Sequence, residues 1–210
     1  MILYSNAHSH VSHRKSRERE LRREAIIEAA ERVFARVGFY SATMAQIAAE
    51  AEFGMGTIYQ HFPNKHGLFS EVILSSIEVF MKELREILRA QSTWKDKLKA
   101  FVEFKLTWLE KNPGYQRLIM EQLIAPVPDI TPPLIERFRQ AQAESIEILK
   151  EVFALANSHG QSFDTELYPL VINGTINEIG NDWLMGILPE PPIKYISGIL
   201  DTIAGGRYVV

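Results

Sequence analysis

The sequence of 210 residues contains no cysteine. Disulfide bonds, thiolate zinc sites and cysteine nucleophiles are therefore excluded, which fits a reducing compartment. No apolar run approaches the roughly 18 residues that span a bilayer, and the N-terminus lacks the apolar core of a signal peptide. We therefore expect a soluble, cytoplasmic protein.

Motifs of catalytic and metal chemistry are equally scarce. No paired carboxylates, Ser-His-Asp set or H-E-x-x-H motif stands at a usable spacing. The spacing of His8, His10 and His13 could hold a metal ion, but these histidines have no carboxylate partner and no regular segment to preform a site. We therefore expect no catalytic residue, no metal and no cofactor.

Charge is unevenly distributed along the chain. Residues 1–70 hold nine Lys/Arg against seven Asp/Glu, a net charge of +2, and the remainder holds fourteen against nineteen, a net charge of −5. A weakly basic front end suits DNA contact only if a few cations are well placed, and its affinity should fall with salt. Residues 1–20 have no apolar period and are expected to form a flexible basic arm, whose cations could alternatively reach DNA.

Helical periodicity accounts for the apolar residues, and no strand period is found. We therefore predict an all-α protein with an N-terminal three-helix domain and a larger C-terminal helical domain. The expected organisation is the arm at residues 1–20, the small domain at residues 21–69 and the second domain at residues 70–210. A long amphipathic helix from about residue 64 to residue 90 should join the two domains.

The small domain begins with a helix that Gly38 should end. Its apolar stripe consists of Ile26, Ile27, Ala30, Val33, Phe34 and Val37. Thr43 then offers a hydroxyl N-cap to a second helix. The predicted inner face of this second helix is Met44, Ile47, Ala48 and Ala51.

After a tight turn at residues 52–54, a third short helix should run from about Met55 to Phe62. Helical spacing turns Met55, Ile58 and Phe62 inward. The outward face is short and polar and comprises Gly56, Thr57, Gln60 and His61. Such a face suits insertion into a DNA major groove about 12 Å wide. The three helices together therefore predict a helix-turn-helix DNA reader.

The order of residues in this segment resembles the N-terminal domain of the TetR family of bacterial transcriptional regulators. The resemblance rests on Thr43, on Ile47-Ala48, on the run F-G-M-G-T-I-Y-Q-H-F at residues 53–62 and on Asn64-Lys65. It implies phosphate contacts by Thr43, Tyr59, His61 and Lys65. It also implies that Met55, Gly56, Thr57 and Gln60 lie against base edges, although each residue taken alone has an ordinary structural explanation.

The second domain is rich in aromatic side chains from several helices, which suits a mostly apolar pocket, although such stripes are more often only core. The resemblance favours the pocket, because family members commonly bind a small effector there. The predicted lining residues are Phe80, Leu84, Phe104, Trp108, Tyr115, Phe138, Asn177 and Trp183. The effector should be hydrophobic or aromatic.

The last two predicted helices, at about residues 165–187 and 193–204, should pair with their twins in a homodimer, as the resemblance also implies. The first of them has an apolar stripe at Ile172, Ile176, Ile179 and Trp183, with Asn173, Asn177 and Asn181 beside it. Gly174 and Gly180 would permit close approach of another helix.

The function predicted from the sequence is a transcriptional regulator, with repression as the family's usual mode. An effector would release the dimer from a palindromic operator on double-stranded DNA. One alternative is a DNA-binding dimer without an effector. A weaker alternative is a helical enzyme that uses Glu103, Glu121 or His159 as acid-base groups.

Overall fold

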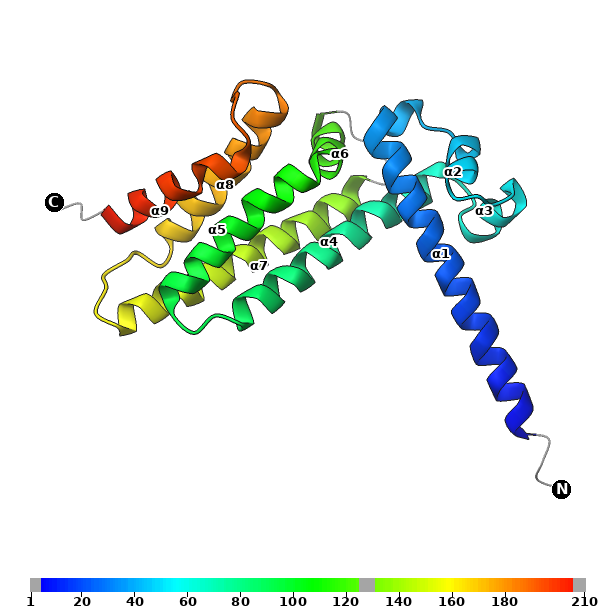
Figure 1. Ribbon diagram of the computed structural model, residues 1–210, viewed down its shortest axis with the longest axis horizontal. Coiled ribbons are helices and arrows are strands. Elements are labelled where there is room, and N and C mark those ends of the chain that lie inside the picture. The colour runs from blue at the N-terminus through cyan, green and yellow to red at the C-terminus, as the bar shows by residue number, and fades with distance from the viewer. Residues whose placement is uncertain (1–4, 125–130, 206–210) are drawn as a thin grey trace. The chain divides into compact units, whose positions relative to one another are not determined.

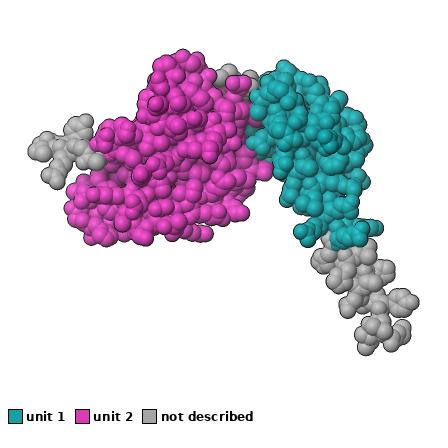
Figure 2. Space-filling model, in the orientation of Figure 1, with its two compact units in different colours: residues 1–73 teal, residues 74–210 magenta. Residues whose placement is uncertain are grey.

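The computed structural model describes the backbone of residues 5–124 and 131–205 and the side chains of residues 14–120 and 132–203 (Figure 1). The described residues form nine α-helices, one short 3-10 helix and no strand. The predicted all-α fold is confirmed. The chain divides into two compact units, residues 1–73 and residues 74–210, which Figure 2 distinguishes by colour.

In the first unit, α1 (Ser5–Ser41) starts earlier than the sequence predicts. We expected a flexible arm over residues 1–20, yet the backbone is already helical at Ser5. Arginine, lysine and glutamate are good helix formers even without an apolar stripe, and Glu18 and Arg22 form an i,i+4 ion pair of 2.5 Å. The side chains of the three clustered histidines lie outside the described residues.

The rest of the unit follows its sequence pattern closely. Gly38 interrupts α1 with φ 77°, a left-handed value that favours glycine. The predicted stripe packs inward, because Ile26, Val33 and Phe34 have no exposed surface. A cluster of Phe34, Phe39 and Phe69 completes this core, with ring centroids 4.6–6.0 Å apart.

Two short helices follow. Thr43 caps α2 (Met44–Glu50), because its Oγ1 accepts a hydrogen bond from the Gln46 backbone N–H at 3.2 Å. The Gln46 side chain in turn accepts from the Thr43 backbone N–H at 2.9 Å, which completes a capping box. A turn at Gly54 leads into α3 (Met55–His61). The predicted N-cap is therefore confirmed.

The second unit is a helical bundle. It contains most of α4 (Lys65–Arg89), α5 (Trp94–Lys111), α6 (Pro113–Ile124), α7 (Thr131–Ser158), α8 (Leu167–Leu184), the 3-10 helix η1 (Pro192–Tyr195) and α9 (Ile196–Gly205). In Figure 1, α5 lies beside α7 and α8, and contacts join each pair of these three helices. No helix among the described residues is long and apolar enough to cross a lipid bilayer.

Close helix packing and ion pairs hold this bundle together. A Cβ atom added at Gly180 of α8 would lie 2.7 Å from Leu109 Cδ1 of α5, so glycine permits the approach that we predicted there. Gly174 faces open space in the described part of the chain, so the approach predicted there stays a prediction for the dimer. An ion pair between Arg85 and Glu144, at 2.5 Å, joins α4 to α7.

Lys65, the first residue of α4, stabilises the connection between α1 and α2. The Lys65 ammonium donates hydrogen bonds to the backbone carbonyl oxygens of Phe39 at 2.9 Å, Tyr40 at 3.2 Å and Ala42 at 2.8 Å. It also lies over the Phe39 ring, 4.6 Å from the centroid. All three N–H donors of Lys65 are thereby used within the first unit.

We expect Lys65→Met to loosen the first unit. The variant leaves three carbonyl groups at the end of α1 without their donor, which should cost about 1–3 kcal/mol of stability. Hydrogen-exchange mass spectrometry should show faster amide exchange over residues 38–47. Lys82→Met, at an exposed lysine of the same helix, is the control and should leave exchange there unchanged; equal exchange in both variants would contradict the assignment.

Candidate DNA interface and effector cavity

The outward face of α3 is formed as predicted, with one correction. Gly56 and Gln60 are exposed, Tyr59 is 48% exposed and Thr57 is half-buried. Helical spacing had turned Met55 inward, but its side chain is 38% exposed. The reason is the shortness of α3, in which Ile58 alone is buried and the first turn follows directly on the Gly54 turn. Met55 therefore belongs to the outward face.

Gly56 has no packing role inside the chain. A Cβ atom added there would meet no atom within 4 Å, and its backbone does not require a positive φ. A glycine in a helix costs about 0.5–1 kcal/mol relative to alanine. Since nothing within the first unit needs this glycine, its small size suits the close approach of an external partner.

A basic groove lies between α1 and α3. Lys15, Glu18, Arg19 and Arg22 of α1 line it together with Gln60 and His61 of α3. Partial burial, followed by the positive charges of Arg19, Arg22 and Arg23, lowers the pKa of His61. The groove therefore carries three cations and one carboxylate from α1, and His61 is neutral at physiological pH. The charge pattern alone had pointed only to a basic arm.

The structure gives two of the predicted phosphate contacts internal partners. The Thr43 hydroxyl caps α2, although the residue stays exposed. Lys65 is the clearer correction, because its ammonium is bound by three carbonyl oxygens and has no donor left for a phosphate. A sequence pattern places a lysine on a helix but does not fix which groups its flexible side chain reaches.

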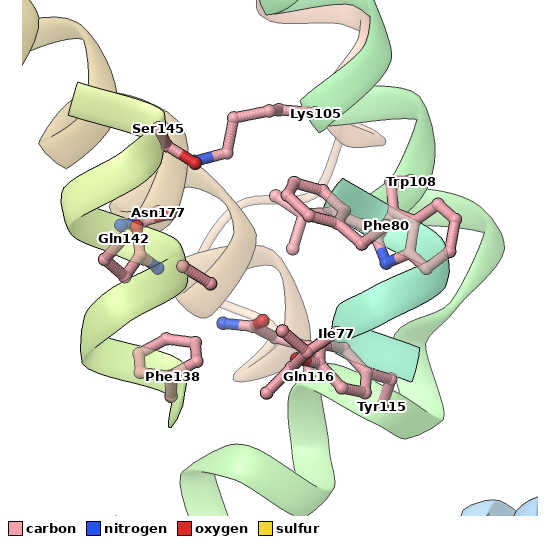
Figure 3. A pocket seen from close by; sticks show the side chains of 12 residues that line it. Ile77, Phe80, Lys105, Trp108, Tyr115, Gln116, Phe138, Gln142, Ser145 and Asn177 are labelled. Atoms are coloured by element: carbon pink, nitrogen blue, oxygen red, sulfur yellow. The ribbon is translucent and has the colours of Figure 1, made fainter. Parts of the chain in front are cut away.

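The second unit contains a cavity of about 480 Å³, counting its open mouth (Figure 3). Helices α4 to α8 all contribute to its wall. The described lining residues are Ile77, Phe80, Lys105, Trp108, Leu109, Tyr115, Gln116, Phe138, Ala141, Gln142, Ser145 and Asn177.

Five of the eight predicted lining residues reach the cavity wall, namely Phe80, Trp108, Tyr115, Phe138 and Asn177. The other three do not. Leu84 has no exposed surface and belongs to the core, and Phe104 packs against Phe80, with 5.2 Å between ring centroids. Trp183 is half-buried elsewhere on α8. Helical spacing identified the right helices but not which of two adjacent apolar positions faces the space.

Sequence reasoning missed the polar end of the cavity. Lys105 is 5% exposed and donates a hydrogen bond of 2.5 Å to Asn173 Oδ1. The Asn173 amide nitrogen donates to Gln142 Oε1 at 3.0 Å. Burial lowers the pKa of Lys105 to about 7. The signal was present in the sequence, because Lys105 lies one helical turn from both Phe101 and Leu109 and interrupts an apolar stripe.

The asparagines of α8 therefore face inward and form no solvated edge. Asn173 is buried beside Lys105, Asn177 lines the cavity, and Asn181 accepts a hydrogen bond of 2.9 Å from Gln116. The indole N–H of Trp108 is buried with no hydrogen-bond partner among the described residues. These groups give an otherwise apolar cavity several hydrogen-bonding positions.

An apolar surface remains uncovered on α8 and α9. Leu167, Leu170 and Val171 are each more than half exposed. A groove beside them is lined by Val171, Ile172, Thr175, Ile179, Tyr195, Gly198, Ile199, Thr202 and Ile203, with no charged residue among them. Contiguous apolar surface of this kind marks interaction sites on soluble proteins.

Comparison with known proteins identifies the family. The family described as bacterial regulatory proteins, tetR family, matches residues 26–72, from α1 into α4. This part of the chain, within the first unit, therefore matches the tetR family. The fatty acid metabolism regulator protein of Bacillus subtilis is 23% identical over 184 residues, which cover 86% of this chain and 93% of that protein.

Two solved structures have a similar fold over most of this chain. FadR from Bacillus subtilis, in complex with stearoyl-CoA, has a TM-score of 0.69 and 21% identity and covers 88% of this chain and 99% of its own. A transcriptional regulator from Saccharomonospora viridis, in complex with choline, has a TM-score of 0.77 and 18% identity and covers 88% of this chain and 96% of its own. One fold thus holds an anionic and a cationic ligand.

We expect Lys105→Met to stabilise the second unit. Wild-type Lys105 has a folded pKa of about 7 against an ordinary value of 10.5, so the folded state binds this proton less tightly than the unfolded state does. Burial of Lys105 therefore lowers the free energy of unfolding, but not above pH 10.5, where the amine is neutral in both states. As the pH falls from 10.5 to 7 this loss grows by about 1.4 kcal/mol per pH unit, and below pH 7 it stays constant. The variant should therefore gain about 1–4 kcal/mol at pH 6, and the gain should shrink as pH rises.

Tryptophan fluorescence during urea unfolding measures this change, because Trp94, Trp108 and Trp183 all lie in the second unit. Lys99→Met is the matched control. Its side chain is 60% exposed on the same helix, so the free energy of unfolding should hardly change. A Lys105→Met protein less stable than wild type at pH 6 would show that the ammonium is compensated in the folded state.

Proposed function

We propose that this tetR-family protein is a dimeric, sequence-specific transcriptional repressor that a small, mainly hydrophobic effector releases from a palindromic operator. The observation that carries the proposal is the exposed face of α3. It combines a glycine with no internal role, Tyr59 and Gln60 as exposed hydrogen-bonding groups, and the basic α1–α3 groove at its end. A short polar helix beside cations is the arrangement by which recognition helices read a major groove.

Within this proposal, base edges are met by Met55, Gly56, Thr57 and Gln60 of α3. Phosphate groups are met by Tyr59 and His61 and, in place of Lys65, by the α1 cations that line the groove. The positive charge of the groove comes from Lys15, Arg19 and Arg22, which suits a backbone that carries one negative charge per phosphate. Thr43 remains an exposed candidate at the start of α2.

The dimer is proposed to form through α8 and α9. Their uncovered apolar groove and the exposed Leu170 and Val171 are what a self-complementary interface would bury. Two recognition helices held at a fixed spacing would contact both halves of a palindrome. A single recognition helix would bind the same DNA more weakly.

The effector is proposed to bind in the cavity of the second unit. Two residues of α4, Ile77 and Phe80, form part of the cavity wall, and the same helix begins at Lys65 in the first unit. A ligand that moves α4 would change operator affinity by the same coupling free energy that DNA imposes on the ligand, typically about 1–3 kcal/mol. The complexes of two proteins of similar fold, one with stearoyl-CoA and one with choline, support a small-molecule effector.

The enzyme alternative finds no support in the cavity. Glu103 lies outside the cavity and pairs with Lys99 at 3.7 Å, and His159 is exposed near the end of α7. The side chain of Glu121 lies outside the described residues. Among the described lining residues, Lys105 and Tyr115 are the titratable groups, and no carboxylate accompanies them as a second acid-base group. We therefore propose a regulator without catalytic activity.

Selection of bound fragments from random duplex DNA should return a palindrome. Against that site, Gly56→Ala should weaken binding by about 1–3 kcal/mol, because a methyl group is added where α3 meets the base edges. The same substitution should leave stability unchanged or raise it by up to about 1 kcal/mol, because the added atom meets nothing in the chain. Fluorescence anisotropy and thermal unfolding measure the two quantities.

Two further variants sharpen this test. Arg22→Ala should reduce the slope of log affinity against log salt by about one, whereas Lys65→Met should leave the slope unchanged while loosening the corner. Gly67→Ala, at an exposed glycine of α4, is the control for the added methyl group. Failure to select any palindrome, or full operator affinity in Gly56→Ala, would count against α3 as the reader.

We expect Val171→Glu to separate the dimer. The side chain is 54% exposed within the chain, so the substitution should cost little in an isolated subunit, yet it places a charge in the proposed apolar interface. Analytical ultracentrifugation should show a monomer at concentrations where wild type is a dimer, with weaker operator binding. Val79→Glu, at a 44% exposed valine of α4, is the matched control and should stay dimeric.

A further inference from the structure

The polar end of the cavity contains a cation without an anion. Lys105 is the one charged side chain among the described lining residues, which include no aspartate or glutamate. Its described partners are neutral: the Asn173 carbonyl oxygen at 2.5 Å and the Phe101 ring, 5.5 Å from Nζ to the centroid. A buried ammonium in such surroundings is uncompensated and strongly favours a negatively charged neighbour.

The surrounding hydrogen bonds leave mainly donors at this end. Asn173 uses its carbonyl oxygen to accept from Lys105 and its amide nitrogen to donate to Gln142 Oε1. Gln142 therefore has its NH2 group left to donate. Figure 3 shows Lys105 extending from α5 toward Ser145 of α7, whose hydroxyl donates, among the described residues, to the Met81 sulfur at 4.0 Å, a weak partner. Two lysine N–H groups and this hydroxyl remain for a ligand.

The remainder of the described wall is mainly apolar and aromatic, with Tyr115, Gln116 and Asn177 as its polar residues. Ile77 and Phe80 of α4, Trp108 of α5 and Phe138 of α7 form part of its walls. Figure 3 shows the Phe80 and Trp108 rings below and to the right of Lys105 and the Phe138 ring at the lower left. A ligand that fits both ends has one compact anionic group and a hydrocarbon or aryl body. A quaternary ammonium head would be repelled by Lys105, and a neutral head would leave the charge uncompensated.

We propose that the effector of this protein is a hydrophobic carboxylic acid, bound as its carboxylate against Lys105 and Ser145 with its apolar body along Phe80, Trp108 and Phe138. The inference rests on the proposed function, because it names the chemical class of the ligand that occupies the same cavity. A free carboxylate has its negative charge at the atom that Lys105 meets, whereas a coenzyme A thioester has a neutral carbonyl group there and its charges on distant phosphates.

The test uses five probes with one shared chain: decanoate, methyl decanoate, decanol, decyltrimethylammonium and decanoyl-CoA. Isothermal titration calorimetry at pH 7 on full-length wild type should give decanoate a dissociation constant at least about tenfold below those of the two neutral probes. Decanoate should also bind more tightly than decanoyl-CoA, and decyltrimethylammonium should not bind. The same rank order should hold for release of the selected operator.

Lys105→Met should abolish the preference for the acid while binding methyl decanoate at least as well as wild type. The retained binding of the neutral probe shows that the cavity is intact. Lys99→Met, exposed on the same helix, should keep the wild-type preference. A neutral probe or decanoyl-CoA that equals decanoate in wild type, or a Lys105→Met protein that still prefers the acid, would overturn the inference.

The pH dependence provides a second readout. Tyr115 of α6 is the other titratable group of the described wall, and burial raises its pKa, so that it stays neutral. No described charged group of α4, α7 or α8 lines the cavity, and Lys105 is the one that does so from α5. Because the carboxylate binds the protonated amine, decanoate affinity should fall by up to about tenfold per pH unit above pH 7, and Lys105→Met should show no such fall.

The outcomes separate this inference from the proposed function. If neutral probes bind as tightly as decanoate and also dissociate the protein from the operator, the proposed function stands, and only the inference that the ligand is a carboxylate is wrong. If wild type binds the operator and none of the five probes binds or releases it, both the effector role of the cavity and its proposed ligand class fail.

Discussion

One uninterrupted helix imposes the main constraint on this protein. Lys65, which fastens the α1–α2 corner, and Phe80, which lines the cavity, are fifteen residues apart on α4. Fifteen residues correspond to about four turns and about 22 Å of helix. The stretch of α4 between Lys65 and Phe80 contains no proline, the residue that most often kinks a helix. In the proposed function, α4 is therefore the element through which a ligand in the cavity would act on the first unit.

The first unit could be predicted largely from its sequence, because periodicity and capping residues act locally. The stripe from Ile26 to Phe34, the Thr43 cap and the Gly38 interruption each follow from contacts within a few residues or one helix face. Lys65 could not be predicted in this way. Its role depends on three carbonyl groups that lie 23 to 26 residues earlier in the chain and converge only in the folded unit.

The cavity could be predicted only in part, because a cavity depends on which side chains fail to fill a space. The aromatic residues of α4, α5 and α7 were identified as lining or near it, yet spacing alone could not separate Leu84 and Phe104 from Phe80 and Trp108. Lys105 was missed because lysine is usually exposed and its burial depends on α8, which supplies Asn173 from 68 residues away.

The buried ammonium also explains how a shared fold can distinguish ligands. If the cavity served only to hold an apolar chain, leucine or methionine at position 105 would fill the space without a desolvation cost. A buried cation raises the free energy of the empty cavity and of every complex with a neutral ligand, and an anionic ligand removes that cost. The difference in binding free energy between an acid and a neutral ligand therefore comes as much from the high free energy of the unbound site as from the contacts made on binding. The proposed specificity for an acid thus comes from Lys105, a residue that lowers the stability of the second unit.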